Sequence, residues 1–342
     1  MLVFLAHAGT PFIPGGFGVT VFFFLSGYLI TTLLRREAES TGRVNLKLFY
    51  LRRTLRIFPP FYLVLSLALV LTLLGALPGP FVPKTLVAQA LHYSNFYVIR
   101  EGWHGLLAGT GVYWSLAVEE HFYLLFPALY LFMIRRSMSG RMQHALLLAC
   151  CALILGWRCW LVFGQGHIGD RTYIGSDTRF DSMLFGCALA VWRNPALDFE
   201  ATEGPSRFEL LATVVGLGLL VASFTLRDPA FRETVRYTLQ GLGLYPLFFV
   251  TIRHPRWSVA RFLNLRFVRF IGTLSYSLYL LHQVMLYAVF GLPLWLPLRV
   301  GLALGLSLLL SIAIWRYVEK PLGKLRSRLS ASAPRPAPGG AA

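Results

Sequence analysis

Long apolar segments alternate with short polar connections along the chain, and this pattern predicts its elements. An α-helix needs about 20 apolar residues to cross the hydrocarbon core of a bilayer. Nine segments are suited to this: 17–34, 58–77, 115–133, 143–163, 178–192, 208–226, 236–252, 270–290 and 298–318. Met1–His7 indicates a tenth span, of which it supplies about a third. The pattern therefore predicts an all-α, polytopic membrane helix bundle with about ten transmembrane helices, the first of them truncated.

Composition supports this prediction. Hydrophobic residues make up 56% of the chain and charged residues 14%, against roughly 45–50% and about 25% in soluble domains. The net charge of +17 comes from Lys and Arg in short clusters between apolar segments, which is the distribution that sets membrane topology. We therefore expect membrane lipids as partners and no nucleic acid. The four cysteines lack metal-ligand spacing, so no metal site is predicted.

The connections between the segments differ in their content of Lys and Arg, which predicts the orientation. Five connections together hold 23 of these residues: 35–57, 134–142, 193–207, 253–269 and 316–342. The alternate connections together hold 5: 8–16, 78–114, 164–177, 227–235 and 291–297. Because cytoplasmic loops carry the excess of positive charge, the first set is expected inside, with both termini cytoplasmic.

The segment 85–99 is apolar enough to suggest an eleventh span. An eleventh span would move the arginines of 134–142 to the outer side, against the charge rule. We therefore expect a re-entrant or interfacial segment on the outer face. Residues 1–329 are predicted to form a single transmembrane domain, and the Pro/Ala/Gly-rich residues 330–342 a disordered cytoplasmic tail.

His7 is a first candidate for chemistry, because it is predicted near the outer end of the first span. A neutral imidazole there can remove a proton from a hydroxyl; the alternative is an interfacial histidine that only makes hydrogen bonds. Ser26 and Gly27 follow three phenylalanines in Phe17–Thr31, FGVTVFFFLSGYLIT. Small residues at such a place are more typical of close helix packing than of catalysis.

Arg52, Arg53 and Arg56 form a basic cluster in Phe49–Tyr62, FYLRRTLRIFPPFY. At helical spacing all three lie within about one face, where their guanidinium groups can hold phosphates bidentately. The alternative is ordinary positive-inside charge in contact with lipid headgroups. The spacing leaves both interpretations open.

Tyr113–Pro127, YWSLAVEEHFYLLFP, contains Glu119 and Glu120 in an otherwise apolar run. Ionisable groups at membrane depth are costly and usually face an internal cavity. Ser115, Glu119 and Tyr123 recur at every fourth position, which predicts a polar stripe toward the bundle interior. The alternative is an interfacial anchor near the outer end of the span.

Two more polar groups stand in apolar surroundings. Arg179 and Asp181, in DTRFD, are predicted at the outer mouth of a span. They are expected to pair with each other or with Glu119. Ser275, Tyr279 and His282 fall on one face of a helix. Such a stripe can bind polar groups of a sugar or cofactor, or it can form hydrogen bonds between helices.

Taken together, these stretches resemble the acyltransferase 3 family of membrane-bound O-acyltransferases. The matching sequences follow the family's order over essentially the whole chain: GGFGVTVFFFLSGYLIT, FYLRRTLRIFPPFYLVL, WSLAVEEHFYLLFP, TRFDSMLFGCALA, SYSLYLLH and VEKP. Members transfer an acyl group, commonly acetyl from acetyl-CoA, to hydroxyls of surface glycans or other glycosylated molecules. The resemblance implies a ten-span core with cytoplasmic termini in a bacterial inner membrane, with acyl-CoA as donor and no permanently bound cofactor.

The resemblance also implies roles for individual residues. His7 is implied as the catalytic histidine, acting as a base or transiently carrying the acyl group, and Glu119 as an acidic residue that positions it. The implied contacts of the CoA phosphates are Arg52, Arg53 and Arg56. The residues implied to bind substrate are Ser26, Trp114, Glu120, Arg179, Asp181, Tyr276, Tyr279 and His282.

The chain departs from the family at two positions. The family's arginine eleven positions before its histidine would precede Met1. Because Met1–His7 is only part of a span, we expect the reading frame to continue upstream. Thr20 stands where many members have Asp, which weakens any role expected for position 20.

Two other classes of protein fit parts of the pattern. A transporter or flippase of a glycan or lipid precursor would use a similar polar cavity without covalent chemistry. Paired repeats with discontinuous helices would favour that class, and the sequence shows no such repeats. A purely structural membrane subunit would not require buried glutamates or a cluster of three arginines, so it is the least favoured.

Overall fold

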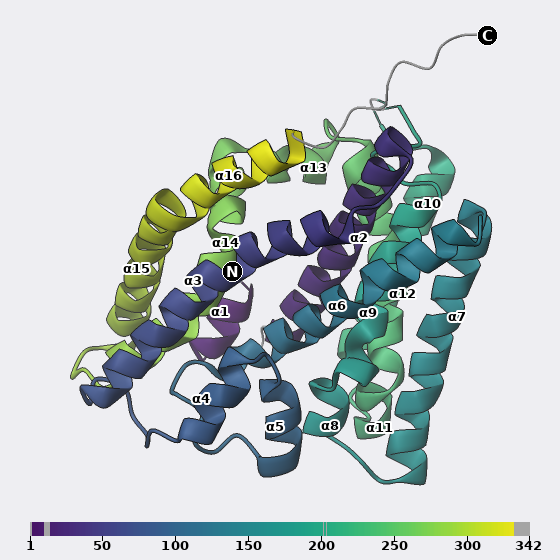
Figure 1. Cartoon of the computed structure of the whole chain (residues 1–342). Coiled ribbons are helices and arrows are strands. Elements are labelled where there is room, and N and C mark those ends of the chain that lie inside the picture. Colours follow the sequence, from purple (N-terminus) through teal and green to yellow (C-terminus); the bar gives the residue numbers. More distant parts are fainter. Residues whose placement is uncertain (1, 10–13, 201, 203, 332–342) are drawn as a thin grey trace.

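A computed structural model describes residues 2–9, 14–200, 202 and 204–331, which form helices and no strand (Figure 1). The α-helices are α1 (Leu2–His7), α2 (Gly15–Thr41), α3 (Leu46–Leu73), α4 (Pro83–Ala90), α5 (Ser94–Glu101), α6 (Trp114–Arg135), α7 (Gly140–Cys159), α8 (Asp170–Tyr173), α9 (Ser176–Val191), α10 (Arg207–Thr225), α11 (Pro229–Glu233), α12 (Val235–Arg253), α13 (Ser258–Leu263), α14 (Arg266–Phe290), α15 (Leu296–Ile314) and α16 (Lys320–Ala331). The turn Gly111–Tyr113 leads into α6, and π-helical turns at Trp160–Gly164 and Trp315–Glu319 extend α7 and α15. The all-α prediction is confirmed.

Each of the nine predicted spans overlaps a helix of 16 residues or more. Six helical stretches of the described residues are long and apolar enough to cross a membrane: Gly15–Thr41, Leu46–Leu73, Gly111–Arg135, Gly140–Gly164, Arg207–Thr225 and Leu296–Leu329. α9, with 16 residues, is shorter than these. The chain is therefore a membrane helix bundle, while the number of ten spans stays a prediction.

The outside of the bundle carries large apolar side chains. Leu73 on α3, Val214 on α10 and Leu309 on α15 are 64%, 63% and 66% exposed. Apolar side chains presented outward along long helices are suited to contact with lipid acyl chains.

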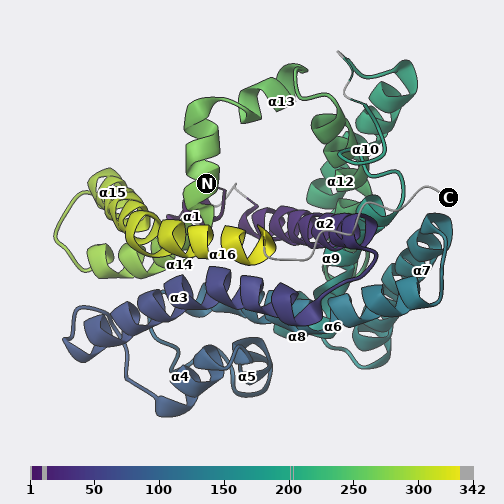
Figure 2. The same cartoon turned by 45° about the horizontal axis from the view of Figure 1, so that its top comes forward.

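The helices enclose two hydrophobic cores. One core lies among α2, α6, α7 and α9 with parts of α10 and α12, and the other lies among α1, α3, α14 and α15. Tyr276 of α14 packs against both cores. Figure 2 shows α13 running between α12 and α14 at one end of the bundle. α14 therefore lies where the two cores join.

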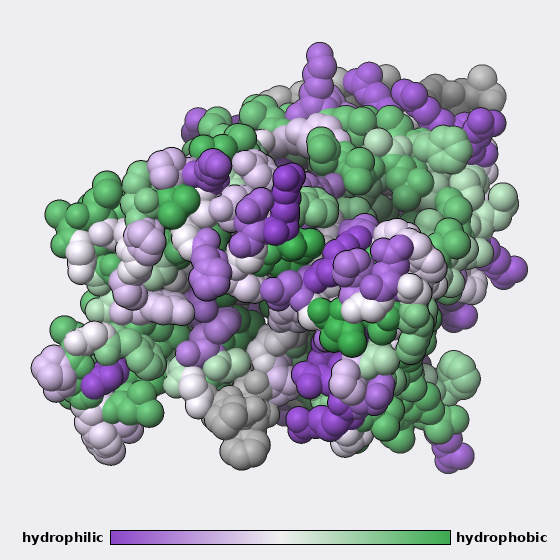
Figure 3. Space-filling model, turned by 90° about the horizontal axis from the view of Figure 1, so that it is seen from below, coloured by the Kyte–Doolittle hydropathy of each residue, from purple (hydrophilic) through white to green (hydrophobic). Residues whose placement is uncertain are grey.

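The two ends of the bundle differ in the segments that they carry. α13 and α16 lie at one end, here called the α16 side, and α4, α5, α8 and α11 lie at the other, the α4 side (Figure 1). The connections predicted to be cytoplasmic fall on the α16 side as far as they are described. Figure 3 looks onto the α4 side, where hydrophilic residues group toward the middle of the face and hydrophobic residues predominate toward its left and right margins.

The segment 85–99 folds as parts of α4 and α5, two helices of eight residues each on the α4 side. Neither is long enough to cross a bilayer. This agrees with the prediction of a segment that does not span. At the other end of the chain α16 continues to Ala331, two residues into the predicted tail. Residues 332–342 lie outside the described residues.

α2 and α9 approach each other closely at two glycines. A Cβ atom added at Gly27 would lie 2.0 Å from the carbonyl oxygen of Met183, and one added at Gly186 would lie 2.0 Å from that of Phe24. Only glycine fits at such distances, and small residues are the usual means of close helix contact in membranes. The packing interpretation of Ser26–Gly27 is therefore confirmed for Gly27.

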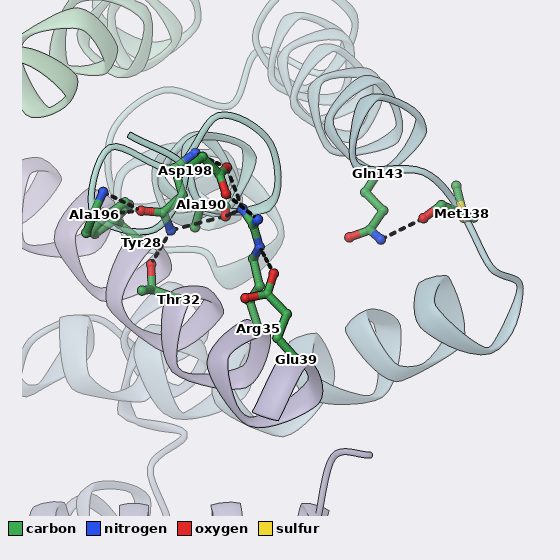
Figure 4. Close-up of polar contacts among 10 residues, drawn as sticks. Tyr28, Thr32, Arg35, Glu39, Met138, Gln143, Ala190, Ala196 and Asp198 are labelled. Atoms are coloured by element: carbon green, nitrogen blue, oxygen red, sulfur yellow. Dashed lines mark hydrogen bonds and ion pairs between the residues drawn. The ribbon is translucent and has the colours of Figure 1, made fainter. Parts of the chain in front are cut away.

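A polar network joins α2 to the turn after α9 on the α16 side (Figure 4). Arg35 donates two hydrogen bonds to Asp198, at 2.8 and 2.5 Å, and one to Glu39 at 2.7 Å. The Tyr28 hydroxyl donates to Asn194 at 2.7 Å. Burial acts to raise the pKa of Asp198, but hydrogen bonds from Arg35 and from the backbone N–H of Asn194 outweigh it and lower that pKa below its usual value. The network fixes the end of the α2–α9 pair.

Candidate active site

α1 and α14 bring two histidines together. Nδ1 of His7 lies 3.1 Å from Nε2 of His282, and the ring centroids are 5.2 Å apart. Nδ1 of His282 lies 2.6 Å from the carbonyl oxygen of Tyr279. A carbonyl oxygen only accepts, so Nδ1 of His282 carries a proton. In the neutral ring Nε2 of His282 is then an acceptor for Nδ1–H of His7.

This arrangement determines which nitrogen of His7 is basic. With Nδ1 of His7 used as a donor, the neutral ring has its lone pair on Nε2. An unprotonated imidazole nitrogen can remove a proton from a hydroxyl group or attack a carbonyl carbon. His282 is buried, whereas His7 is exposed. The pair therefore has one ring fixed in the core and one ring presented outward.

His7 lines a cavity of about 710 Å³, the His7 cavity. Trp114 and Tyr279, both predicted at the site, also line it. Three further lining residues were not predicted, because they lie in connections or beside the predicted stripe: Trp103, Tyr173 and Gln283. Much of the lining comes from the connection between α3 and α6, so the cavity opens on the α4 side.

Glu119 occupies a separate buried position on α6. Its carboxylate accepts hydrogen bonds from the hydroxyls of Ser26 and Tyr123, and all three side chains are buried. The expected contact between Glu119 and the His7 imidazole is not found among the hydrogen bonds of the described residues, because Glu119 faces α2 and His282 takes the place beside His7. The predicted polar stripe is found for Glu119 and Tyr123, which are both buried and joined by a hydrogen bond. Ser115 instead bonds to the hydroxyl of Tyr279 at 2.6 Å.

The arginine cluster of α3 lines a second cavity, of about 490 Å³, here called the Arg53 cavity. The prediction that the three arginines share a face is confirmed, since all of them line it: Arg52, Arg53 and Arg56. Arg52 forms an ion pair with Glu37 at 2.6 Å. Arg36 from α2 and Arg326 from α16 complete the basic lining. The last two were missed because they are far from the cluster in the sequence.

Arg53 connects this cavity to the buried carboxylate. Its guanidinium carbon lies 4.6 Å from the ring centroid of Tyr123, whose hydroxyl donates to Glu119. The polar groups thus form a series through the bundle, from the Arg53 cavity on the α16 side through Tyr123, Glu119 and Ser26. Such a series supplies hydrogen-bonding groups to the space between α2, α3 and α6.

Arg179 and Asp181 do not pair with each other or with Glu119, which corrects that expectation. Asp181 forms a fully buried ion pair with Arg158 of α7 at 2.7 Å. Arg179 is also fully buried and donates to the Tyr173 carbonyl at 3.0 Å. Arg158 also donates to the carbonyl oxygens of Thr234 and Thr178, whereas Nε of Arg179 is buried without a hydrogen-bond partner among the described residues.

Aromatic rings surround the guanidinium group of Arg179. Its guanidinium carbon is 4.1 Å from the ring centroid of Tyr237 and 5.9 Å from that of Trp114. Nη2 donates to Thr20 at 3.1 Å, so position 20 does contact the cluster. The ring of Tyr173, which lines the His7 cavity, lies against the Arg179 guanidinium, 5.6 Å from its carbon to the ring centroid. The structure places Arg179 behind the cavity wall and not in it.

The remaining predicted residues are distributed over α6 and α14. The hydroxyl of Tyr276 donates to the carbonyl oxygen of Ile57 at 2.9 Å, which joins α14 to α3. Oε1 of Glu120 is buried without a hydrogen-bond partner among the described residues. Ser275 is exposed, so it does not extend the stripe of Tyr279 and His282. Ser275 therefore lies on the face of α14 that points away from the packed core.

Comparisons with known proteins give a family match and several curated relatives. A family model described as acyltransferase domain matches residues 1–316. Peptidoglycan O-acetyltransferase OatA of Listeria monocytogenes is 29% identical over 294 residues, which is 81% of this chain and 46% of that protein. O-acetyltransferase OatA of Staphylococcus aureus is 30% identical over 294 residues, 82% of this chain and 47% of that protein. The chain thus spans about half the length of these curated relatives. No solved structure matches the chain.

Proposed function

The chain belongs to the acyltransferase family whose domain covers residues 1–316, and we propose that it transfers an acyl group, acetyl first of all, from acyl-CoA to a hydroxyl of a cell-surface glycan. The observation that carries this proposal is the His7–His282 pair, which leaves Nε2 of His7 as a base beside a cavity. We place the protein in the bacterial inner membrane with its α16 side in the cytoplasm, following the distribution of Lys and Arg.

The donor is proposed to bind in the Arg53 cavity. Its arginines offer planar, permanently charged donors that match the phosphate groups of CoA. The α16 side is the proposed cytoplasmic side, where acyl-CoA is made. The pantetheine arm would then run between α2, α3 and α6, where Glu119, Ser26 and Tyr123 offer hydrogen-bond partners for its amides.

The proposed reaction is a direct transfer at the His7 cavity. Nε2 of His7 takes the proton of the acceptor hydroxyl while the acceptor oxygen bonds to the thioester carbonyl carbon. The tetrahedral intermediate collapses with cleavage of the C–S bond. The CoA thiolate recovers the proton from His7, so the products are an O-acyl ester and CoA. A water-accessible imidazole held by a buried partner is suited to both proton transfers.

The proposed acceptor is a glycan on the outer side. The names of the relatives from Listeria monocytogenes and Staphylococcus aureus refer to O-acetyltransferases, and the first name specifies peptidoglycan. Peptidoglycan fragments are therefore the first acceptors to test for this chain. The His7 cavity opens on the α4 side, which would face such an acceptor.

The test uses the full chain purified in lipid vesicles with acetyl-labelled acetyl-CoA and a panel of peptidoglycan and polysaccharide fragments. We expect label in an alkali-labile ester on a glycan, with an equal amount of CoA released. A protein that moves an unmodified glycan or lipid across the vesicle membrane and releases no CoA would contradict the proposal and support a transporter.

A further inference from the structure

The α4 side carries a second and larger cavity beside the His7 cavity. This space, of about 810 Å³ and here called the Arg236 cavity, lies among α2, α8, α10, α11 and α12. Gly15, Gly16 and Tyr173 line both cavities, so the two are neighbours across this wall. A Cβ atom at Gly16 would lie 3.0 Å from the Tyr173 hydroxyl. Any larger side chain at position 16 would therefore crowd the wall between the two cavities.

Three arginines line the Arg236 cavity: Arg227, Arg232 and Arg236. The predicted outer connections hold only 5 Lys and Arg in total, and two of these five are Arg227 and Arg232. Because positive charge that orients the chain is expected on the opposite side, topology does not account for this cluster. Its position in a concave surface is that of a binding site.

The two acidic residues of the lining offset the cluster only in part and form no ion pair with it among the described residues. Glu233 accepts a hydrogen bond from Thr172 at 2.5 Å, and Asp170 accepts one from Trp103 at 2.6 Å. Within the described part of the chain, no ion pair includes any of the three arginines. Nη2 of Arg236 donates to the Tyr237 hydroxyl at 2.7 Å, while its Nε is buried without a partner. Three guanidinium groups against two carboxylates leave the lining with a surplus of one positive charge, and Nε of Arg236 is an unused donor.

We propose that the Arg236 cavity is the acceptor subsite and selects an anionic glycan, one that carries a carboxylate or a phosphate group. This inference rests on the proposed acyl transfer. The anion pairs with the arginines, and a hydroxyl of the same or the next sugar reaches His7 past the Gly15–Gly16 wall. Guanidinium groups in a partly enclosed site hold such anions through charge-assisted hydrogen bonds. Neutral glycans lack this contact and bind more weakly.

The experiment compares matched acceptors on the full chain in vesicles of zwitterionic phosphatidylcholine, which supply no net anionic lipid. The acceptors are a uronic-acid oligosaccharide, the same oligosaccharide with its carboxyls reduced to alcohols, and a phosphorylated counterpart. Acetyl transfer from acetyl-CoA is measured as KM and kcat for each. The variants are Arg232→Gln with Arg236→Gln, and Arg100→Gln as control, because Arg100 is exposed on the α4 side and lines neither cavity.

For the wild-type protein we expect a KM about tenfold lower for an anionic acceptor than for the reduced one. The double variant should raise KM for the anionic acceptor by about tenfold and leave the neutral acceptor unchanged, while the control changes neither. The better of the carboxylated and phosphorylated acceptors identifies the anion. At saturating acetyl-CoA, raising the salt concentration should raise KM for the anionic acceptors only, a measurement that needs no variant.

This design distinguishes failure of the anionic subsite from failure of the proposed acyl transfer. Equal KM values for anionic and reduced acceptors, without salt dependence, would overturn the anionic subsite while leaving the acyltransferase activity intact. Failure of the wild-type protein to transfer acetyl to any acceptor would contradict the proposed function itself. An equal rise in KM for the anionic and the neutral acceptor in the double variant would also overturn the subsite. It would show that the arginines do not distinguish the anion.

Discussion

At the scale of single residues, the chemistry proposed for His7 depends on a hydrogen bond made by another residue. His282 is held by the Tyr279 carbonyl and therefore presents an acceptor to His7. This fixes the tautomer of His7 without placing a charge beside it, unlike a carboxylate partner. We therefore propose that His282 positions His7, the role first expected for Glu119, because His282 and not Glu119 lies at hydrogen-bonding distance from His7.

The first prediction concerns this positioning. His282→Ala should lower kcat for acetyl transfer by about tenfold or more, with KM for acyl-CoA unchanged, because the base is misoriented while the donor cavity is intact. His282→Gln keeps an acceptor oxygen and should recover part of kcat. NMR of labelled His7 should show its Nδ1–H tautomer in the wild-type protein and a mixture in His282→Ala. An unchanged tautomer and kcat would contradict the role.

The second prediction concerns the donor cavity. Arg53→Ala combined with Arg56→Ala should raise KM for acyl-CoA by about tenfold or more, because two phosphate contacts are lost. Arg256→Ala is the control, since Arg256 is exposed and does not line the cavity. Binding of CoA alone, measured by calorimetry, should weaken in parallel. If the variant and the control bind CoA with equal affinity, the donor does not bind in this cavity.

Sequence reasoning at this scale found residue types but not their partners. Arginines, glutamates and histidines in apolar runs are conspicuous because burial of such groups is costly. The pairing of His7 with His282 joins residues 275 positions apart, and that of Asp181 with Arg158 depends on how α7 packs on α9. Spacing along one helix does not report contacts between helices, so these partners could not be predicted.

At the scale of elements, the contact of α2 with α9 positions the site. Gly27 and Gly186 allow the two backbones to approach, and the neighbouring Ser26 is thereby directed to Glu119. Long apolar runs predicted where the helices are, because length and hydropathy suffice for that. Which helices pack together depends on the surface shape of both, and the sequence pattern does not contain this information.

The third prediction tests that contact. Gly27→Ala should lower the free energy of unfolding by about 2 kcal/mol or more, because its Cβ would overlap a backbone carbonyl that has little freedom to move. Gly218→Ala in α10 is the matched control, since nothing lies within 4 Å of its added Cβ. Thermal unfolding in detergent measures both. Equal melting temperatures would show that the α2–α9 approach is not tight.

At the scale of the whole molecule, the bundle has two different ends. The Arg53 cavity lies on the α16 side, while the His7 and Arg236 cavities lie on the α4 side. The counts of Lys and Arg predicted which connections share an end of the bundle, because each connection needed only to be assigned to one of two ends. The arrangement suits an enzyme that uses a donor from one side of a membrane to modify an acceptor on the other.

The fourth prediction tests the orientation of the chain in the membrane. In a background without the four native cysteines, Glu101→Cys on the α4 side should react with a membrane-impermeant maleimide in intact spheroplasts. Arg256→Cys on the α16 side should react only after the membrane is opened. The reverse pattern would place the donor cavity outside and contradict the proposed path of acyl transfer.

The most direct test of the account compares two histidine variants in the acetyl-transfer assay. His7→Ala should lower kcat by about 10²- to 10⁴-fold, because it removes the base that activates the acceptor. His167→Ala should retain wild-type activity, because His167 is exposed in a connection and lines none of the three cavities. Both proteins should be present in the membrane at wild-type amounts and bind CoA equally. Full acetyl transfer by His7→Ala would contradict the central claim that this residue performs the chemistry.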